Sequence, residues 1–502
     1  MEVNRILPPE IWQMIHKNLP GFQPVLRMVC KNWHQSLDKI EPVDFQQALA
    51  RENCLKLLKW YQRFQTGYPR VLVEVSITAA RHGHIDVLKW CRYTIGCSWN
   101  SNVCKAAVEG GHLDVLKMLR SGKQKCPWNS EACELAITTD RFDILKWLCD
   151  PKTGGGSCPC DTKTCSTAAG AGRLDILRWL LDPKTGGGRC PCNEYTCSAA
   201  ALNGYLDILM FAKANLCPWN KYTCSQAVAG GHFHILEWAR DAENGVGICP
   251  WSKWCCFEAA KTGNISMLTR LRDPDTQGGQ CPWDETVTIA AASHGQLSTL
   301  IWLRDPTTGG GQCPWDLFVP INAARYGHIN VLDWCINNGW SWSADLCSSA
   351  ASGGHLDLLI WARDNGCPWD ADTCRSAAAG GHLDVLIWLR DPTTGGGRCP
   401  WDRWVCEGAA RNDHLPIIKW LRNPETGGGV CPWDYTIVLW AARIGNLEML
   451  KWVTANGCPW VSALQNWASQ AGPPNPEMMK WIWEQLGRGN VSFSDLESDL
   501  YS

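Results

Sequence analysis

One short motif recurs along most of the chain and limits what the chain can fold into. The triplet Cys-Pro-Trp, or a close variant, recurs with a first spacing of 29 residues and then spacings of only 27 or 32. A fixed period of this length is typical of repeat proteins, in which each unit packs on its neighbours. A chain of 502 residues also exceeds what one compact core usually serves. The motifs start at 97, 126, 158, 190, 217, 249, 281, 313, 340, 367, 399, 431 and 458.

Segment 367–390 illustrates the unit. Asp370 follows Trp369, and Asp, Asn or Ser holds the same place in twelve of the thirteen units, which indicates a helix N-cap. Cys374 then falls at the fourth helical position, where we expect it to pack on Trp369 as a hydrophobic staple. A Gly-Gly pair ends this first helix, and the stretch LDVLIWLR predicts a second helix that is buried on several sides. The unit is therefore two helices joined by a glycine turn.

The tryptophans follow the same period. Trp occupies the place of Trp388 in twelve of fifteen second helices, including Trp60 and Trp481, so we expect most of the 31 tryptophans to form the core between units. The 32-residue units differ from the 27-residue units by five extra residues at one site, which predicts a loop. Its TGGG sequence is not followed by a Lys-Ser or Lys-Thr pair that opens a helix, so a phosphate-binding loop is not expected.

The 29 cysteines are expected to be reduced packing residues. Pairs such as Cys367 and Cys374 lack the two-residue gap of common zinc sites, and Thr288, Pro320 or Val438 replaces the second member elsewhere. No metal and no cofactor is therefore expected. In the Cys-Pro-Cys segments 158–160 and 190–192, a smaller core residue and a reactive thiol pair are both compatible with the sequence.

No candidate catalytic group is apparent outside the repeated positions of the sequence. Histidine recurs at the turn between the two helices, where a turn hydrogen bond explains it better than catalysis. No Ser-His-Asp set or isolated catalytic Cys is apparent, so we expect a protein that is not an enzyme. The turn histidines are His84, His112, His232, His328, His355, His382 and His414.

Charge and hydropathy limit which partners and which location are expected for the chain. The 47 Lys and Arg residues nearly balance the 49 Asp and Glu residues, giving a formal charge of −2 without long runs of one sign. Neither nucleic acid nor an anionic membrane is expected as a partner on this ground. The N-terminus lacks the pattern of a signal peptide, and no run of 18 apolar residues occurs, so an intracellular location, in cytoplasm or nucleus, is expected.

The repeat resembles a known family. The stretch AAAGGHLDVLIWL is similar to the core of ankyrin repeats, and the resemblance recurs from about 46 to 486, although the period differs from about 33 residues and DTCRSAA stands where TPLHLAA is usual. The phrases GHLDVLKW, CPWD and DPxTGGG also resemble the expanded ankyrin families of giant DNA viruses of amoebae. The resemblance implies a viral protein that acts in a host cell, with a shortened ankyrin hairpin.

Residues 6–37 stand outside the period and resemble an F-box, through LPPE, a helix that ends in Leu, and VCKNW. The resemblance implies docking onto the Skp-type adaptor of a cullin-RING ubiquitin ligase. A helical cap for the repeat array is the alternative for this segment. The residues matched to adaptor binding are Leu7, Pro8, Glu10, Ile11, Ile15, Leu19, Leu26, Val29, Cys30 and Trp33.

These observations predict an all-α fold: an ankyrin-like helical-repeat solenoid behind an N-terminal three-helix F-box-like domain. The expected domains are the F-box-like segment 1–42, a solenoid of about 14 to 15 units over 43–486, and an acidic tail, 487–502, without stable structure.

A partner is expected to bind where units differ from one another, and the two positions after the N-cap meet this condition. The expected function is a substrate receptor that holds an unknown target protein and recruits the ligase, and the alternative is an ankyrin scaffold that sequesters or masks a host protein. The partner-binding residues inferred from this variation are Tyr195, Tyr222, Trp254, Phe318, Arg403, Trp404 and Tyr435.

Overall fold

The computed structural model describes most of the repeat region. The described residues are 42–62, 69–121, 125–150, 160–182, 190–241, 243, 248–273, 280–307, 313–391, 393, 398–424, 430–459 and 476–485. The segment expected to form an F-box-like domain, with all of its adaptor-binding residues, lies outside these ranges, and so does the tail 487–502. Two compact units divide the chain, Met1–Trp251 and Ser252–Ser502, which we call unit 1 and unit 2.

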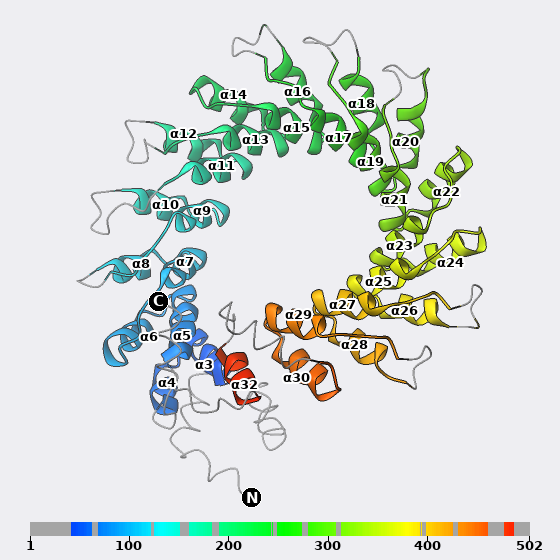
Figure 1. Ribbon diagram of the computed structural model, residues 1–502. Coiled ribbons are helices and arrows are strands. Elements are labelled where there is room, and N and C mark those ends of the chain that lie inside the picture. The colour runs from blue at the N-terminus through cyan, green and yellow to red at the C-terminus, as the bar shows by residue number, and fades with distance from the viewer. Residues whose placement is uncertain are drawn as a thin grey trace, which may run out of the picture. The chain divides into compact units, whose positions relative to one another are not determined.

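All regular structure in the described residues is helical, and the helices alternate between a first and a second helix of each pair (Figure 1). The first helices of unit 1 are α3 (Pro42–Arg51), α5 (Pro69–Arg81), α7 (Ser101–Gly110), α9 (Glu131–Thr138), α11 (Thr162–Gly170), α13 (Glu194–Leu202) and α15 (Lys221–Ala229). The second helices are α4 (Leu55–Gln62), α6 (Ile85–Lys89), which continues as one π-helical turn η2 (Trp90–Thr94), α8 (Leu113–Arg120), α10 (Phe142–Cys149), α12 (Leu174–Leu181), α14 (Leu206–Ala214) and α16 (Phe233–Arg240).

Unit 2 repeats the same alternation and ends with one further helix, α32 (Pro476–Gln485). Its first helices are α17 (Lys253–Lys261), α19 (Glu285–Ser293), α21 (Phe318–Arg325), α23 (Ala344–Gly353), α25 (Ala371–Gly380), α27 (Arg403–Arg411) and α29 (Thr436–Ile444). Its second helices are α18 (Ile265–Leu271), α20 (Leu297–Arg304), α22 (Ile329–Asn337), α24 (Leu356–Asp364), α26 (Leu383–Arg390), α28 (Leu415–Leu421) and α30 (Leu447–Ala455).

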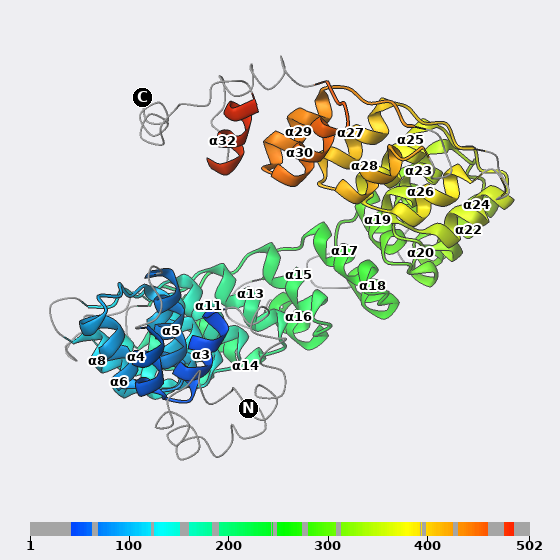
Figure 2. The same ribbon diagram turned by 90° about the horizontal axis from the view of Figure 1, so that it is seen from below.

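Each unit has two layers. Successive first helices pack closely on one another, whereas successive second helices touch much less. The reason is side-chain size: the buried Ala377 and Ala378 let neighbouring first helices approach, while the second helices carry larger residues such as Leu386 and Leu389. Within each unit the pairs follow one another in chain order, as the second view also shows (Figure 2).

The N-cap prediction is confirmed in segment 367–390. The side chain of Asp370 accepts a hydrogen bond from the backbone N–H of Asp372, and Asp370 and Thr373 form a capping box. Gly381 ends α25 with a φ of 86°, a left-handed conformation that favours glycine. At the preceding turn, a Cβ on Gly354 would lie 2.4 Å from Nδ1 of His382, so this position has no room for a side chain.

The turn histidines connect neighbouring repeats. Nε2 of His382 lies 3.1 Å from the backbone oxygen of Ser352, and Nε2 of His355 lies 2.9 Å from that of Arg325. Both contacts reach back about one repeat length in the chain. The histidine at the turn therefore makes a hydrogen bond, as expected. Its partner lies in the preceding repeat, so the bond connects two repeats and does not close a single turn.

Most of the described tryptophans lie at the margin of the core rather than in it, although Trp90 and Trp99 are buried. Val385, Leu386 and Leu389 are fully buried, but Trp388 is only half-buried. Trp388 packs edge-on against Trp369 of its own repeat, with ring centroids 5.7 Å apart. The expectation that most tryptophans form the core between repeats is wrong for this position, because the smaller aliphatic residues already fill the space between the helices.

An arginine completes this tryptophan pair in most repeats. The guanidinium of Arg390, at the end of α26, lies 3.8 Å from the ring centroid of Trp401 in the next repeat and donates a hydrogen bond to the backbone oxygen of Cys399. Arg272 does the same with Trp283 and Cys281. Burial lowers the pKa of Arg390. A buried arginine is thus held by a ring face and a carbonyl, an arrangement we call the arginine–tryptophan turn.

The cysteine of the Cys-Pro-Trp motif has a related task. Its thiol donates to the backbone oxygen of the N-cap residue one repeat earlier, as between Cys399 and Asp370 at 3.2 Å. A small, buried, weakly polar side chain suits this position. The same contact is made by Cys126, Cys190, Cys249, Cys281, Cys313, Cys367, Cys431 and Cys458.

Among the described residues, no helix is both long enough and apolar enough to span a bilayer.

Candidate binding surface

The partner-binding residues inferred from the sequence share one structural position. Most are the second residue of a first helix, two positions after the N-cap, where the N-cap side chain accepts the residue's own backbone N–H. Asn193 accepts from Tyr195 at 3.1 Å, and Asp402 accepts from Trp404 at 2.9 Å. The cap therefore fixes the backbone and leaves the aromatic ring at the N-terminal edge of the first-helix layer. We call Tyr195, Tyr222, Trp254, Phe318, Trp404 and Tyr435 the aromatic row.

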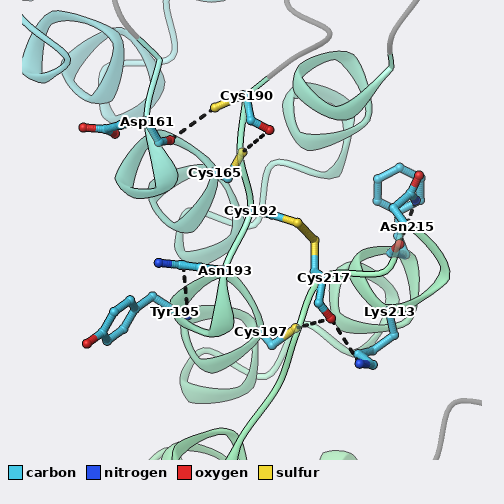
Figure 3. The surroundings of a disulfide bond; sticks show 11 residues. Asp161, Cys165, Cys190, Cys192, Asn193, Tyr195, Cys197, Lys213, Asn215 and Cys217 are labelled. Atoms are coloured by element: carbon cyan, nitrogen blue, oxygen red, sulfur yellow. Dashed lines mark hydrogen bonds between the residues drawn. A yellow bond between two sulfur atoms is a disulfide. The ribbon is translucent and has the colours of Figure 1, made fainter.

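In unit 1, the structure brings two members of the row onto neighbouring helices. Tyr195 on α13 is 63% exposed and Tyr222 on α15 is 47% exposed, and these two helices pack on each other. The ring of Tyr195 extends away from the sulfur atoms near the start of α13 (Figure 3). The aromatic surface of these tyrosines is therefore available to a ligand.

In unit 2, four members lie on four first-helix starts. Phe318 and Tyr435 are about half exposed, at 50% and 52%, and Trp254 and Trp404 are 38% and 39% exposed. Trp254 also packs edge-on against Phe257, at 5.0 Å between ring centroids. Only Trp404 and Tyr435 stand at the starts of neighbouring helices, α27 and α29. The alternative to binding for these aromatics is packing on the adjacent repeat, but the contact of Trp254 with Phe257 lies within α17, and Phe318 and Tyr435 stay about half exposed.

Cations accompany the row. The guanidinium of Arg403 lies 4.6 Å from the ring centroid of Trp404, and the ammonium of Lys253 lies 5.8 Å from that of Trp254. Each cation also pairs with the aspartate that follows the motif tryptophan of the next repeat: Arg403 with Asp434 at 3.1 Å, and Lys253 with Asp284 at 2.6 Å. The row therefore combines ring faces with cations whose charge is partly balanced.

These ion pairs affect titration. The hydrogen bond from Lys253 to Asp284 raises the pKa of Lys253. Burial alone would raise the pKa of Asp284, but hydrogen bonds from Lys253 and Thr286 outweigh it and hold this pKa below its usual value. Both groups stay charged near neutral pH.

The Cys-Pro-Cys segments do not behave as simple core positions. Cys192, which stands where other repeats have Trp, forms a disulfide with Cys217 of the next repeat, with the two Cα atoms 5.6 Å apart (Figure 3). Cys190 instead directs its thiol to the backbone oxygen of Asp161, as other motif cysteines do. The expectation that all cysteines are reduced is wrong for this pair, because the small Cys192 side chain lies within bonding reach of the next motif.

A second group of sulfur atoms lies one repeat earlier. Sγ of Cys149 is 2.9 Å from Sγ of Cys160 and 4.0 Å from Sγ of Cys133. Sequence reasoning did not bring these three residues together. Cys149 holds the place of Arg390 and Cys160 the place of Trp401, so two positions that touch each other changed to Cys together. That paired change is the signal that was available in the sequence.

The structure also shows a functional position that sequence reasoning missed. The arginine at the end of the second helix is a recurring part of the turn, and its signal is a basic residue near the end of that helix, four, six or nine residues before the motif cysteine. The residues concerned are Arg120, Arg240, Arg272, Arg304, Arg363, Arg390 and Arg422.

Comparison with known proteins yields no family for this chain. No family model matches it, and no curated protein matches it. Solved structures of the pentatricopeptide repeat protein PPR10 match it, one of them in complex with an 18-nucleotide psaJ RNA element. That match has 14% identity, covers 98% of this chain and 79% of the other, and has a TM-score of 0.35. A structure of PPR10 from maize matches at 13% identity over 96% and 76%, with a TM-score of 0.28.

These findings correct the family prediction. Neither an ankyrin nor an F-box model matches, and the solved structures just named are of a pentatricopeptide repeat protein. The expected ankyrin-like solenoid, giant-virus family and F-box identity are therefore wrong, and the coarser description, an all-α repeat of paired helices, stands. Among the described residues no strand occurs, so the ankyrin hairpin is absent there. The shared GHLDVLxW pattern reflects the packing of helix pairs, which several repeat classes need.

The predicted function and partners are corrected with the family. A ubiquitin-ligase substrate receptor, an ankyrin scaffold that masks a host protein, and a Skp-type adaptor as partner all depended on the ankyrin and F-box resemblance, and no family match supports it. The exclusion of nucleic acid as a partner is corrected as well. Net charge and the lack of long charge runs do not describe the local chemistry of one edge, where Arg403 and Lys253 lie beside exposed rings.

Proposed function

We propose that the aromatic row binds a single-stranded nucleic acid, with bases stacked on the exposed rings. The observation that carries the proposal is the placement of exposed aromatics at the starts of neighbouring first helices: Tyr195 and Tyr222 at equivalent positions, and Trp404 with Tyr435 one position apart in the repeat. Every base has a π-face, so stacking tolerates many sequences and repeats naturally along a strand. A helical repeat that offers one ring per repeat matches the periodic spacing of bases.

Cations beside the rings support the same ligand. Lys221 lies 5.6 Å from the ring centroid of Tyr222, and Arg403 lies 4.6 Å from that of Trp404. A cation beside a stacking ring can reach the phosphate of the stacked nucleotide. Because Arg403 already pairs with Asp434, it contributes less than a solvent-exposed arginine would. We expect stacking to supply most of the affinity and the salt dependence to be shallow.

The row is interrupted within unit 2. Asp345 on α23 and Asp372 on α25 occupy the position that Trp404 holds on α27. A carboxylate there repels phosphate and offers no ring. We therefore expect short stacking stretches of about two bases, one at α13 and α15 and one at α27 and α29, rather than one continuous track.

We infer that the chain acts by binding rather than by catalysis. The side chains of the row supply ring surface and charge, and their backbone positions are fixed by N-caps. Such a surface holds a ligand in place without a nucleophile or a general base.

Fluorescence anisotropy with labelled 20-nucleotide RNA and DNA strands tests the proposal. Two double variants, Tyr195→Ala with Tyr222→Ala and Trp404→Ala with Tyr435→Ala, are each expected to weaken binding at least about tenfold, because stacking on one aromatic residue contributes about 1–3 kcal/mol. Tyr93→Ala is the matched control, since Tyr93 is 70% exposed but lies outside the row.

The outcomes are distinct. Weaker binding in both double variants, with Tyr93→Ala unchanged, supports the row as the site. A comparison of the RNA and DNA strands then identifies the preferred sugar. Absence of binding by the wild-type chain at low salt, or equal losses in the control, overturns the proposal and leaves a protein ligand as the explanation for the exposed rings.

A further inference from the structure

Three thiols in unit 1 converge from three separate elements. Cys133 lies in the first turn of α9, Cys149 is the last residue of α10, and Cys160 precedes α11. Their Sγ atoms all lie within 4.8 Å of one another, and this is the one group of three metal-ligating side chains at such distances in the part of the chain that the structure describes. The cluster is independent of the aromatic row.

The surroundings suit a soft metal ion. Cys133 is fully buried, Cys149 is 6% exposed, and Cys160 is half-buried. Thiolates select ions such as Zn²⁺, for which a metal–sulfur bond of about 2.3 Å places neighbouring sulfurs about 3.8 Å apart. Cys133 and Cys149 are already at 4.0 Å, and Cys149 and Cys160, at 2.9 Å, need only a small side-chain rotation to separate.

Comparison with other repeats indicates that this cluster is a replacement and not a by-product of the repeat. The equivalent of Cys133 in segment 367–390 is Cys374, which is also buried. There, the places of Cys149 and Cys160 are taken by Arg390 and Trp401, in direct contact. A single change to Cys at either place would break the arginine–tryptophan turn. The two changes together remove both the cation and the ring and leave three sulfur atoms facing one another.

We propose that Cys133, Cys149 and Cys160 bind one thiophilic metal ion, with Zn²⁺ as the representative, which joins α9, α10 and the start of α11 in place of the arginine–tryptophan turn. The double replacement removes the buried positive charge of the arginine, and the ion instead balances two of the three negative charges of the thiolates. Each protonated thiol that becomes a ligand releases its proton to solvent, so binding to three thiols releases up to three protons. The fourth position of a tetrahedral site is available to water or to Cys190.

Cys190 is a further thiol beside the cluster. It interacts with Cys160, and its own thiol lies 3.2 Å from the backbone oxygen of Asp161.

Metal content of the full-length protein tests the proposal. Protein reduced and then loaded with Zn²⁺, and separately with Co²⁺, is passed through a desalting column and assayed by mass spectrometry for bound metal. We expect one tightly held equivalent and, with Co²⁺, the intense near-ultraviolet absorption of sulfur-to-cobalt charge transfer. The double variant Cys149→Arg with Cys160→Trp, which restores the turn found elsewhere, is expected to fold and to lose that equivalent.

Two matched variants sharpen the test. Cys374→Ala removes the thiol equivalent to Cys133 in a repeat without the other two, and it is expected to keep the metal. Arg390→Cys with Trp401→Cys copies the cluster into unit 2 and is expected to raise the content from one equivalent to two. Circular dichroism confirms that each variant is folded.

Two results would overturn the proposal. The first is equal metal content in the wild-type protein and in the Cys149→Arg, Cys160→Trp variant. The second is no retained metal in reduced wild-type protein, with peptide mapping of air-exposed protein then showing Cys149 disulfide-bonded to Cys160. That second result would assign the cluster to thiol oxidation instead of metal binding.

Discussion

The connection between one helix pair and the next, which we call a joint, is stabilised in two different ways in this chain. Before α27, Arg390 lies over Trp401 and donates to a carbonyl, so a ring, a cation and a hydrogen bond close the joint between repeats. Before α13, Leu181 stands where the arginine would be, and Cys192 is bonded to Cys217. The helices on either side are alike in length and capping. The joint between two helix pairs is therefore a place where the repeat accepts substitution while the pairs themselves are kept.

The comparison teaches that the repeat constrains pairs of positions, not single ones. An arginine without its ring, or a ring without its cation, would leave a buried charge or an unfilled space. In the joints that contain sulfur, both the arginine and the tryptophan are replaced, and a disulfide bond or a cluster of thiols is found instead. The predictions that follow measure how different the two kinds of joint are, beginning with the largest expected difference.

The largest expected difference is in thiol reactivity, between Cys160 in a joint that contains sulfur and Cys335, a buried cysteine of α22. Burial raises the pKa of Cys335 to about 12, so at pH 8 only about one such thiol in ten thousand is ionised. Hydrogen bonds from neighbouring thiols lower the pKa of Cys160. In reduced, metal-free protein, iodoacetamide should modify Cys160 at least about 100-fold faster than Cys335. Between pH 7 and 9 the rate at Cys335 should rise about tenfold per unit, because its thiolate appears only near the raised pKa, whereas the rate at Cys160, whose pKa is lowered, should rise less steeply. Pulse labelling with peptide mass spectrometry measures both rates, and equal rates would contradict the distinction.

Reduction of the disulfide should weaken one joint selectively. The bond links residues 25 apart in the chain, and a cross-link of that span stabilises a fold by about 3 kcal/mol. Dithiothreitol, or the pair Cys192→Ser with Cys217→Ser, should therefore lower the hydrogen-exchange protection of α13 and α14 by roughly that amount. The helices α25 and α26 serve as the internal reference because their joint contains no disulfide. Unchanged protection of α13 under reducing conditions would show that the bond adds nothing to this joint.

Removal of the tryptophan from an arginine–tryptophan turn should have the next largest effect on local stability. Trp401→Ala deletes a half-buried ring that contacts both Arg390 and Trp420, and we expect a loss of about 2 kcal/mol in local stability. Cys160→Ala, at the equivalent place in a sulfur joint, should lose about 1 kcal/mol or less in metal-free protein. Local exchange protection of the helices beside each joint measures both. A loss at Cys160→Ala as large as that at Trp401→Ala would remove the distinction between the joints.

Helix caps should show the smallest difference, which makes them the control for the comparison. Asp161 before α11 and Asp370 before α25 each form a capping box with a threonine three residues later. Asp161→Ala and Asp370→Ala should therefore destabilise their helices by a similar amount, about 1 kcal/mol. Clearly unequal losses, measured in the same exchange experiment, would show that the two regions differ in the helices as well as in the joints.

Several elements follow from local sequence alone. The N-cap at Asp370 and the glycine turn after α25 were predictable because capping and left-handed turns depend on residues within one turn of each other. The helix pairs followed from the period for the same reason. The exposed places of Tyr195 and Tyr435 were also predictable, because variation between repeats at a fixed position marks a surface.

Family and joint chemistry were not predictable in this way. The pattern around His382 satisfies the packing of many helix-pair repeats, and so it pointed to ankyrin repeats without specifying them. The place of Trp388 depended on whether aliphatic residues already fill the inter-helix space, which is decided by three-dimensional packing.

By itself, the sequence determined the repeat length, the helix pairs, their caps and the turn glycines, because each depends on neighbours a few residues away. Only the tertiary structure decided which residues meet across repeats: Arg390 with Trp401, Cys192 with Cys217, and Cys149 with Cys160. These contacts join residues 11 to 25 positions apart, on elements whose relative placement depends on how closely the small-residue first helices pack. The conformational preferences of single residues do not specify how closely these elements approach one another.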